Sequence, residues 1–191
     1  TQLKEGDSVR TSTDGRLVLA FDDGSALRLD SDTEVKLTSL VADDIKITQT
    51  DGMAYSRVVP SGRTYTIAMN DVAYKALGTA FVTVNKSNEK GVQVFQSSVK
   101  VGSVKEAVKE GEQYFKVNPD TALQEKTTAI DLNSVADNTF MQWNLTEDEK
   151  NVAFKERMGV FNQVKVILEQ KLKALQDQKA KEATATPAQQ S

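Results

Sequence analysis

The sequence predicts a mainly β fold: a coiled, solenoid-like β-roll or a sandwich of many short strands, followed by a C-terminal helical appendage. From residue 1 to about 117, apolar residues recur at every second position in short runs, which is the period of a half-buried strand. Turn pairs separate the runs, and the first two, Asp14-Gly15 and Asp23-Gly24, lie nine residues apart. Beyond residue 132 the apolar spacing changes to three or four, as in a helix.

Each predicted strand is a run in which apolar residues alternate with other residues. The runs are Leu17-Leu19-Phe21, Leu27-Leu29, Val35-Leu37, Ile45-Ile47, Tyr65-Ile67-Met69, Val82-Val84, Val92-Val94 and Val99-Val101. Asp-Gly suits the turns between them, because glycine accepts a positive φ and aspartate bonds to the backbone two residues on. The step between turns is not a strict repeat, so we expect many small strands rather than a regular solenoid.

The second part of the chain divides into three segments. Residues 118–131 contain Pro119 and little periodicity, and they are interpreted as a linker. Residues 132–181 are expected to be helical, with a short helix near 134–144 and a long amphipathic helix over about 147–180. Thr146 is the expected N-cap of the long helix, because Glu149 follows three residues later. Residues 182–191 are small and polar and should be disordered.

Composition excludes several classes of protein. A formal net charge of −3 argues against general nucleic-acid binding, which needs a basic face. There is no cysteine and no histidine, so disulfides, thiol chemistry, imidazole metal ligands and Ser-His pairs are excluded. No stretch of about 20 apolar residues could span a membrane. Because Thr1 is not methionine, we expect a signal or anchor segment upstream.

The acidic run DSDTE offers the candidate metal ligands Asp30, Asp32 and Glu34. Hard cations take several oxygen ligands, and alternate acids can converge on one ion. The spacing and the glycine of an EF-hand are missing, so a solvated turn is the favoured interpretation. We therefore expect no metal site and no cofactor.

The helical segment carries the candidate partner surface. Its members are aromatic or long aliphatic side chains at helical spacing: Trp143, Phe154, Phe161, Leu168, Leu172 and Leu175. Trp143 with Phe140 is expected to anchor a short helix, although an exposed tryptophan would indicate a partner patch. The stripe could pack on its own domain or pair with a second chain, giving a monomer or a helix-mediated dimer. We expect Phe154 to about Leu168 to dock within the chain and the last turns to project into solvent.

These motifs together resemble the opening of the FecR domain family. The matching positions run in order along the first strands: Gly6-Asp7, Val9, Thr11, Gly15-Arg16, Asp23-Gly24-Ser25, Leu27-Arg28-Leu29 and Thr33. A later block of the family is matched by Gly78-Thr79-Ala80-Phe81, and its closing strands by VQVFQSSVKV and VKEGEQYFKV with Gly111-Glu112. The resemblance covers residues 3 to about 117. It makes Gly6, Asp7, Asp14, Gly15, Asp23, Gly24, Gly78, Thr79 and Gly111 structural turn residues of the coil.

The resemblance implies a non-enzymatic, extracytoplasmic interaction or sensor domain of the FecR type. Its partner would be a protein of the cell envelope or surface. Known members relay a signal from an outer-membrane transporter to a sigma factor. Residues 1–191 include neither their anti-sigma segment nor their transmembrane helix, so that role is not carried over whole. Two alternatives stay open: a carbohydrate- or ligand-binding surface module, and a carboxylate-based hydrolase with two acids in a cleft.

Overall fold

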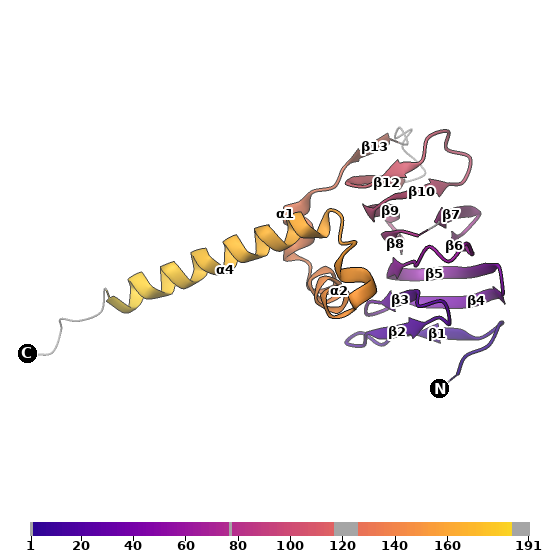
Figure 1. Cartoon of the computed structure of the whole chain (residues 1–191), viewed down its shortest axis with the longest axis horizontal. Helices are drawn as coiled ribbons and strands as arrows, with labels where there is room; N and C mark the ends of the chain where they lie inside the picture. The colour runs from indigo at the N-terminus through magenta and orange to yellow at the C-terminus, as the bar shows by residue number, and fades with distance from the viewer. Residues whose placement is uncertain (1, 77, 117–125, 185–191) are drawn as a thin grey trace, which may run out of the picture.

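The structure is a computed structural model that describes residues 2–76, 78–116 and 126–184. Its β strands stack into a column, helices lie along one side of that column, and α4 extends away from it (Figure 1). The described residues form thirteen strands in one continuous sheet that folds around a shared core. The mainly β fold class and the helical appendage predicted from the sequence are therefore confirmed.

The continuous sheet folds into two layers. We call the layer that lies away from the helices the far sheet. It is built by β1 (Ser8–Arg10), β4 (Glu34–Val41), the first half of β5 (Asp44–Arg57), β6 (Thr64–Met69), β7 (Val72–Ala76), β10 (Ser98–Val101) and β11 (Val108–Lys109). We call the layer that the helices cover the helix-side sheet. It is built by β2 (Leu17–Ala20), β3 (Ala26–Leu29), the second half of β5, β8 (Ala80–Lys86), β9 (Glu89–Gln96), β12 (Glu112–Lys116) and β13 (Lys126–Ala129).

The chain passes back and forth between the two sheets, which coils it around the core. The hairpin of β2 and β3 lies in the helix-side sheet, and that of β4 and β5 begins in the far sheet. β5 then crosses over, pairing with β6 in its first half and with β8 in its second. Among the described strands, every pair is antiparallel except β5 with β6. This arrangement needs a turn every few residues, which the Asp-Gly and Gly positions supply.

The space between the two sheets holds the main core. Most of the alternating residues predicted from the sequence point into it, among them Leu27, Val35, Ile47, Ile67 and Val92. The exceptions are Val82 and Val84, which pack under the helices, and Leu17, which is exposed. Each sheet contributes every second side chain, because successive side chains of a strand point to opposite faces. Burial of each such side chain stabilises the fold by about 1.5–3 kcal/mol.

In the described part of the chain, four helices follow the strands. They are α1 (Leu132–Asp137), α2 (Thr139–Lys150), α3 (Val152–Lys155) and α4 (Phe161–Thr184). Side chains of Asp131, Asn138 and Asn151 cap α1, α2 and α3 by accepting hydrogen bonds from backbone N–H groups of the first turn. No helix among the described residues is both long and apolar enough to cross a bilayer.

The helices cover the outer surface of the helix-side sheet through a second core. Tyr55, Val82 and Phe95 supply its sheet side, and residues of α1, α2 and the start of α4 supply its helix side. Phe161 is fully buried there, with ring centroids 5.6 Å from Tyr55 and 4.7 Å from Phe95. Since Val164 is also buried, the predicted docking of this stripe within the chain is confirmed.

The predicted helix boundaries need correction. The expected helices at 134–144 and 147–180 are divided differently, because α2 runs through Thr146 and ends at Lys150. Thr146 is not an N-cap; its hydroxyl donates to the carbonyl of Gln142 one turn earlier. α4 begins only at Phe161, after a turn in which Gly159 has a φ of +54°. A Cβ at Gly159 would lie 2.2 Å from the carbonyl oxygen of Phe95, so this turn lies directly against β9.

The predicted linker and tail are only partly described. Within the expected linker 118–131, Lys126–Ala129 form β13 and pair with β12, so this part is a strand. The rest of the linker up to residue 125 lies outside the described residues. Of the expected disordered tail 182–191, residues 182–184 continue α4, and residues 185–191 lie outside the described residues.

Candidate functional site

The predicted turn residues form the frame of the β domain. Gly6, Gly24, Gly78 and Gly111 have φ values of +92°, +85°, +74° and +80°. Gly15 has no positive φ, but a Cβ there would lie 2.7 Å from the Ser12 hydroxyl oxygen. The remaining turn residues bond locally: Asp7 accepts from Lys4 N, Asp14 from the Ser12 hydroxyl and Asp23 from Ser25 N, while the buried Thr79 donates to the Gln96 carbonyl.

The acidic run does not converge on a common point. Asp30 forms an ion pair with Arg16, with 3.0 Å between the Oδ1 and Nε atoms. Asp32 occupies a tight turn with a φ of +50°, and Glu34 begins β4. No group of three or more acidic residues in the described part of the chain could hold a metal ion.

A buried ionic network joins the helices to the β domain. The carboxylate of Asp148 on α2 is completely inaccessible to solvent and lies between two arginines of the helix-side sheet. Its Oδ1 accepts from Arg28 on β3 at 2.7 Å, and its Oδ2 lies 3.4 Å from Arg57 Nε on β5. A buried charge is stable only when it is paired and hydrogen-bonded, and both conditions are met here.

Further donors and acceptors complete this network. The Tyr55 hydroxyl donates to Asp148 Oδ2, and Arg28 also donates to the side-chain and backbone oxygens of Asn144. The second terminal nitrogen of Arg57 donates to the carbonyls of Phe154 and Arg157, which fixes the turn that follows α3. Burial and the nearby Asp148 carboxylate raise the pKa of the Tyr55 hydroxyl well above its ordinary value. The network therefore ties three separate points of the helical segment to one patch of sheet.

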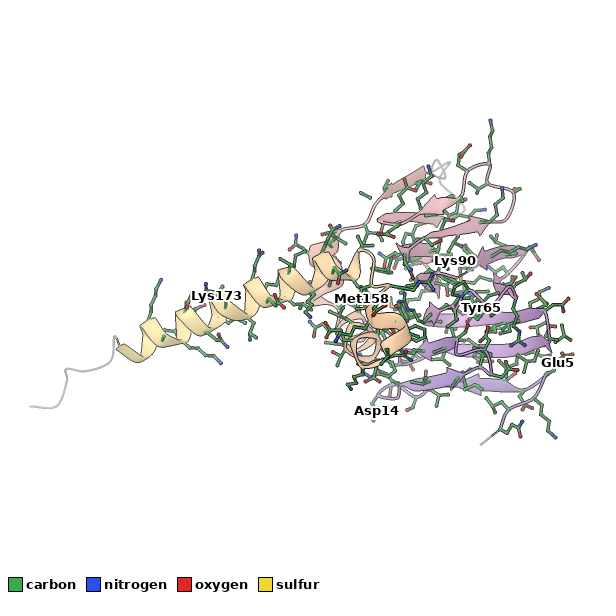
Figure 2. The ribbon with its side chains drawn as sticks, in the orientation of Figure 1. Glu5, Asp14, Tyr65, Lys90, Met158 and Lys173 are labelled. Atoms are coloured by element: carbon green, nitrogen blue, oxygen red, sulfur yellow. The ribbon has the colours of Figure 1, made fainter. Side chains whose placement is uncertain are left out.

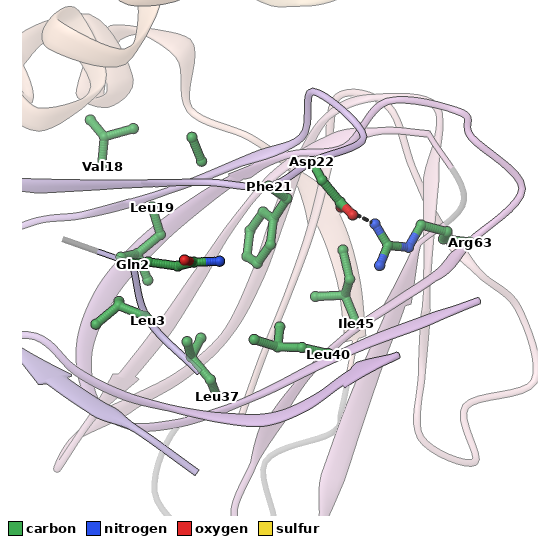
Figure 3. A pocket seen from close by; sticks show the side chains of 11 residues that line it. Gln2, Leu3, Val18, Leu19, Phe21, Asp22, Leu37, Leu40, Ile45 and Arg63 are labelled. Carbon is green, nitrogen blue, oxygen red and sulfur yellow. Dashed lines mark hydrogen bonds and ion pairs between the residues drawn. The ribbon is translucent and has the colours of Figure 1, made fainter. Parts of the chain in front are cut away.

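A cavity of about 670 Å³ opens at the N-terminal end of the column (Figure 3). Its lining combines polar and apolar surface and comes largely from the N-terminal segment, β2, β4 and β5, with Leu3, Leu19, Leu37, Leu40 and Ile45 pointing into it (Figure 3). Arg63 and Asp22 form an ion pair at its rim, and the arginine also donates to the Val41 carbonyl. The cavity is the place where the main core reaches the surface.

The predicted partner surface is divided by the structure into a buried and an exposed part. Phe154 and Phe161 are buried in this chain and are not available to a partner, and Leu168 is half-buried. Trp143 is half-buried beside Phe140, and the Arg16 guanidinium lies 5.6 Å from each ring centroid. Leu172 and Leu175 are 58% and 56% exposed.

The part of α4 that bears these leucines stands clear of the column. Two ion pairs hold its earlier turns: Lys165 to Glu149 of α2 at 2.7 Å, and Lys171 to Asp137 of α1 at 2.5 Å. Beyond them α4 projects away from the β domain, with Lys173 on the projecting part (Figure 2). We call residues 172–184 the α4 arm.

Comparison with protein families decides what the β domain is. Residues 7–100 match the model of the family described as FecR protein. The β domain belongs to the FecR family. The match spans β1 to the third residue of β10, so both Arg28 and Arg57 lie in the FecR domain, while their partner Asp148 lies in the helical segment beyond it.

Two solved structures share the fold of a large part of this chain. Both are of a candidate anti-sigma factor from Parabacteroides distasonis ATCC 8503, at resolutions of 1.65 and 2.50 Å. The first has a TM-score of 0.57 at 16% identity, with 68% of this chain and 63% of that chain covered. The second has a TM-score of 0.58 at 15% identity, with coverages of 80% and 74%. No curated protein matches the sequence significantly.

Sequence reasoning missed the buried network of the FecR domain. The sequence places Arg28 only in the family motif Leu27-Arg28-Leu29, and it predicts no role for Asp148. The signal in the sequence was Arg28 itself, a charged residue between two core leucines. Its side chain points to the outer face of the strand, and if other segments cover that face, the charge needs a buried partner. Pairing Arg28 with an acid 120 residues away could not be inferred from spacing.

Proposed function

We propose that this chain is a non-enzymatic interaction domain of the FecR type that binds a protein partner in signalling outside the cytoplasm. Membership of the FecR family supports the signalling role, and the shared fold with solved structures described as a candidate anti-sigma factor agrees with it. We take the partner to be a protein, because Leu172 and Leu175 leave an apolar helix face in solvent.

The single observation that carries the proposal is the α4 arm. Leu172 and Leu175 lie on one side of a helix whose earlier turns are fixed by packing and two ion pairs. A short helix whose apolar side chains lie in water is only marginally stable. An apolar helix face laid into a partner's groove, or against a partner's helix, would bury the leucines and stabilise the arm.

The distribution of carboxylates and aromatics argues against the alternatives. The fully buried carboxylate of Asp148 is occupied by two arginines, and Asp22 is the only acid among the residues that line the 670 Å³ cavity. A two-carboxylate hydrolase would need a second acid there. The large exposed apolar side chains of the described residues are leucines and valines, whereas a carbohydrate platform uses exposed aromatics.

Site-specific photo-crosslinking in the source organism tests the proposal. A photoreactive amino acid replaces Leu172 or Leu175 in one pair of strains and Asp177, an exposed residue on the opposite face of α4, in a control strain. We expect a crosslinked product of one defined mass from the leucine positions and none from Asp177. Equal products from all three positions, or none from any, would overturn the assignment of the α4 arm as the partner surface.

The location is tested with the full-length gene. Fusion of alkaline phosphatase, which is active only outside the cytoplasm, to the C-terminus should give active enzyme. Fusion of a fluorescent protein that matures only in the cytoplasm should stay dark when it is exported unfolded. The reverse pattern would place the domain in the cytoplasm and contradict the proposal.

A further inference from the structure

The N-terminal end of the column is an open edge of the helix-side sheet. In the described residues β2 pairs with β3 alone, so its other side meets no strand. The four residues of β2, Leu17–Ala20, are all apolar and carry no charge that would discourage pairing. Proteins normally protect such an edge with charges, proline or a covering segment, because unpaired backbone groups recruit another strand.

The register of β2 identifies the backbone groups that face this edge. Phe21 N donates to Ser25 O at 2.9 Å, which makes these two residues a hydrogen-bonded pair. Hydrogen-bonded and non-hydrogen-bonded pairs alternate along an antiparallel ladder. Leu19 therefore bonds to β3, whereas the N–H and C=O groups of Val18 and Ala20 point to the open side.

Side chains around the edge are suited to an apolar occupant. Leu17, Val18 and Val41 are 37%, 45% and 48% exposed, and they account for three of the large apolar side chains that the described surface leaves in water. Beside them lies the 670 Å³ cavity, within the range of about 300–1,000 Å³ that is typical of ligand pockets. Figure 3 shows that its leucines point inward from both sheets.

One polar atom at the rim lacks a partner. Arg63 Nε is buried and makes no hydrogen bond, and it is the one such side-chain atom found in the described part of the chain. The positive charge of Arg63 is already paired with the exposed carboxylate of Asp22. The atom therefore needs a neutral acceptor such as a backbone carbonyl, because an anion would compete with Asp22.

We propose that this end of the column binds an extended peptide segment of a protein partner. The segment adds an antiparallel or parallel strand to β2, bonds to Val18 and Ala20, and places apolar side chains of every second residue in the cavity. A small shift of the Arg63 side chain exposes its buried Nε, which then donates to one of the peptide's carbonyls. The inference shares with the proposed function the premise that the chain binds protein, but it uses a different surface from the α4 arm.

Two other occupants fit less well. A small amphiphile with an anionic head would fill the cavity but would leave the edge of β2 unused and would oppose Asp22. A second copy of this chain could pair β2 with β2, but it would bring a second empty cavity and no side chain to fill the first. An extended peptide satisfies the edge, the cavity and Arg63 together.

The test begins with phage-displayed random peptides of eight residues selected against the full chain. We expect the selected peptides to carry apolar residues at every second position. A fluorescein-labelled selected peptide is then titrated by fluorescence anisotropy. Val18→Lys should weaken binding at least about tenfold, by adding a charge to an apolar rim, and Arg63→Lys about fivefold, by removing one hydrogen bond donor. Val166→Lys, at a similarly exposed valine of α4, is the matched control and should change the affinity for the peptide less than about twofold.

Amide hydrogen exchange provides a readout of the bonding itself. Saturating peptide should slow exchange at Val18 and Ala20 at least about tenfold, while Leu19, already bonded to β3, changes little. Leu172→Glu with Leu175→Glu should leave peptide binding intact, so failure of the α4 arm and failure of this site are distinguishable. Selected peptides without alternation, or unchanged exchange at Val18 and Ala20, would overturn the inference.

Two further outcomes would identify a different occupant and would also overturn it. Binding of dodecanoate that Val18→Lys abolishes, with no peptide bound, would indicate a small amphiphile. A dimer in analytical ultracentrifugation that Val18→Lys dissociates, again with no peptide bound, would indicate a second copy of the chain.

Discussion

Asp148 is the residue on which the join between the helices and the FecR domain depends. Its carboxylate accepts from Arg28 and Tyr55 and lies beside Arg57, and none of the four side chains is more than slightly exposed. Replacing the whole group by apolar residues could be neutral, but removing one partner leaves uncompensated buried charge. The network is thus better suited to fixing one position of α2 on the sheet than to adding net stability.

Asp148→Ala should lower the free energy of unfolding by about 3–5 kcal/mol, because two buried arginines lose their counter-charge. Asp177→Ala, at an acid on the exposed α4 arm, should change it by less than about 0.5 kcal/mol. Urea denaturation followed by Trp143 fluorescence measures both. Similar midpoints for the two variants would show that the buried network is not what holds the helices.

The raised pKa of Tyr55 predicts that the free energy of unfolding falls at alkaline pH. Burial and the Asp148 carboxylate raise the pKa of its hydroxyl in the folded state, whereas in the unfolded chain it stays near 10. Above about pH 10 the unfolded state loses this proton first, so the folded state binds more protons and stability falls as the pH rises. Below that pH the contribution is constant.

Urea denaturation between pH 8 and 11 should show this fall, and it should be shallower in Tyr55→Phe, which has no hydroxyl to titrate. All other ionisable groups are common to the two proteins, so their effects cancel in the comparison. An identical pH dependence of the wild type and the variant would contradict the assignment.

At the scale of elements, the turns set the coil. Gly24 ends the turn between β2 and β3 with a φ of +85°, a region that β-branched side chains avoid. Gly24→Val should therefore destabilise the protein by at least about 1–2 kcal/mol, the cost of left-handed backbone for a residue with a Cβ. Gly24→Asn is the matched control, since asparagine tolerates this conformation, and it should cost markedly less. Equal melting temperatures of the two variants would contradict the prediction.

The strands were more predictable than the helices for a physical reason. Alternation identified most strands, because each has one face in the core between the sheets. It did not reveal that the helix-side sheet is buried on both faces: Val82 and Val84 pack under the helices, while Phe81 points into the main core. Which face a buried residue takes depends on distant segments, and local spacing carries no information about them.

The predicted helix boundaries were wrong because the packing of the helices on the sheet, rather than local propensity, sets where each helix begins and ends. Asn138 caps α2, and Thr146, whose spacing to Glu149 fits a capping box, lies in the middle of that helix. The chain must turn between α3 and α4 so that Phe161 reaches Tyr55 and Phe95, and Gly159 provides that turn against β9. The same limit applies to the candidate site, since the exposed leucines were predicted but the cavity and the Arg63 position were not.

For the whole molecule, the two cores make the FecR domain and the helical segment one unit. A chain ending at Asp131 would expose the sheet residues of the second core, including Tyr55 and Phe95, which are fully buried in the whole chain. It would also leave Arg28 and Arg57 without their counter-charge.

We expect this shortened chain to melt at a clearly lower temperature than the whole chain and to aggregate, as measured by differential scanning calorimetry and light scattering. A chain ending at Lys171 keeps both cores and loses only the α4 arm and tail, and it should melt within a few degrees of the whole chain. An unchanged melting temperature for the chain ending at Asp131 would show that the helices are merely appended.

We propose that one cooperative body presents the exposed leucines of the α4 arm to a protein partner. Residue-resolved amide hydrogen exchange of the dilute, isolated chain tests it most directly. We predict strong protection in β3, β5, β8 and α2, protection in α4 as far as about Leu168, and exchange near the rate of an unfolded peptide from Leu172 onward. Protection that continues at core level through residue 184 would contradict the account, because the arm would then already be covered, by this chain or by a second copy.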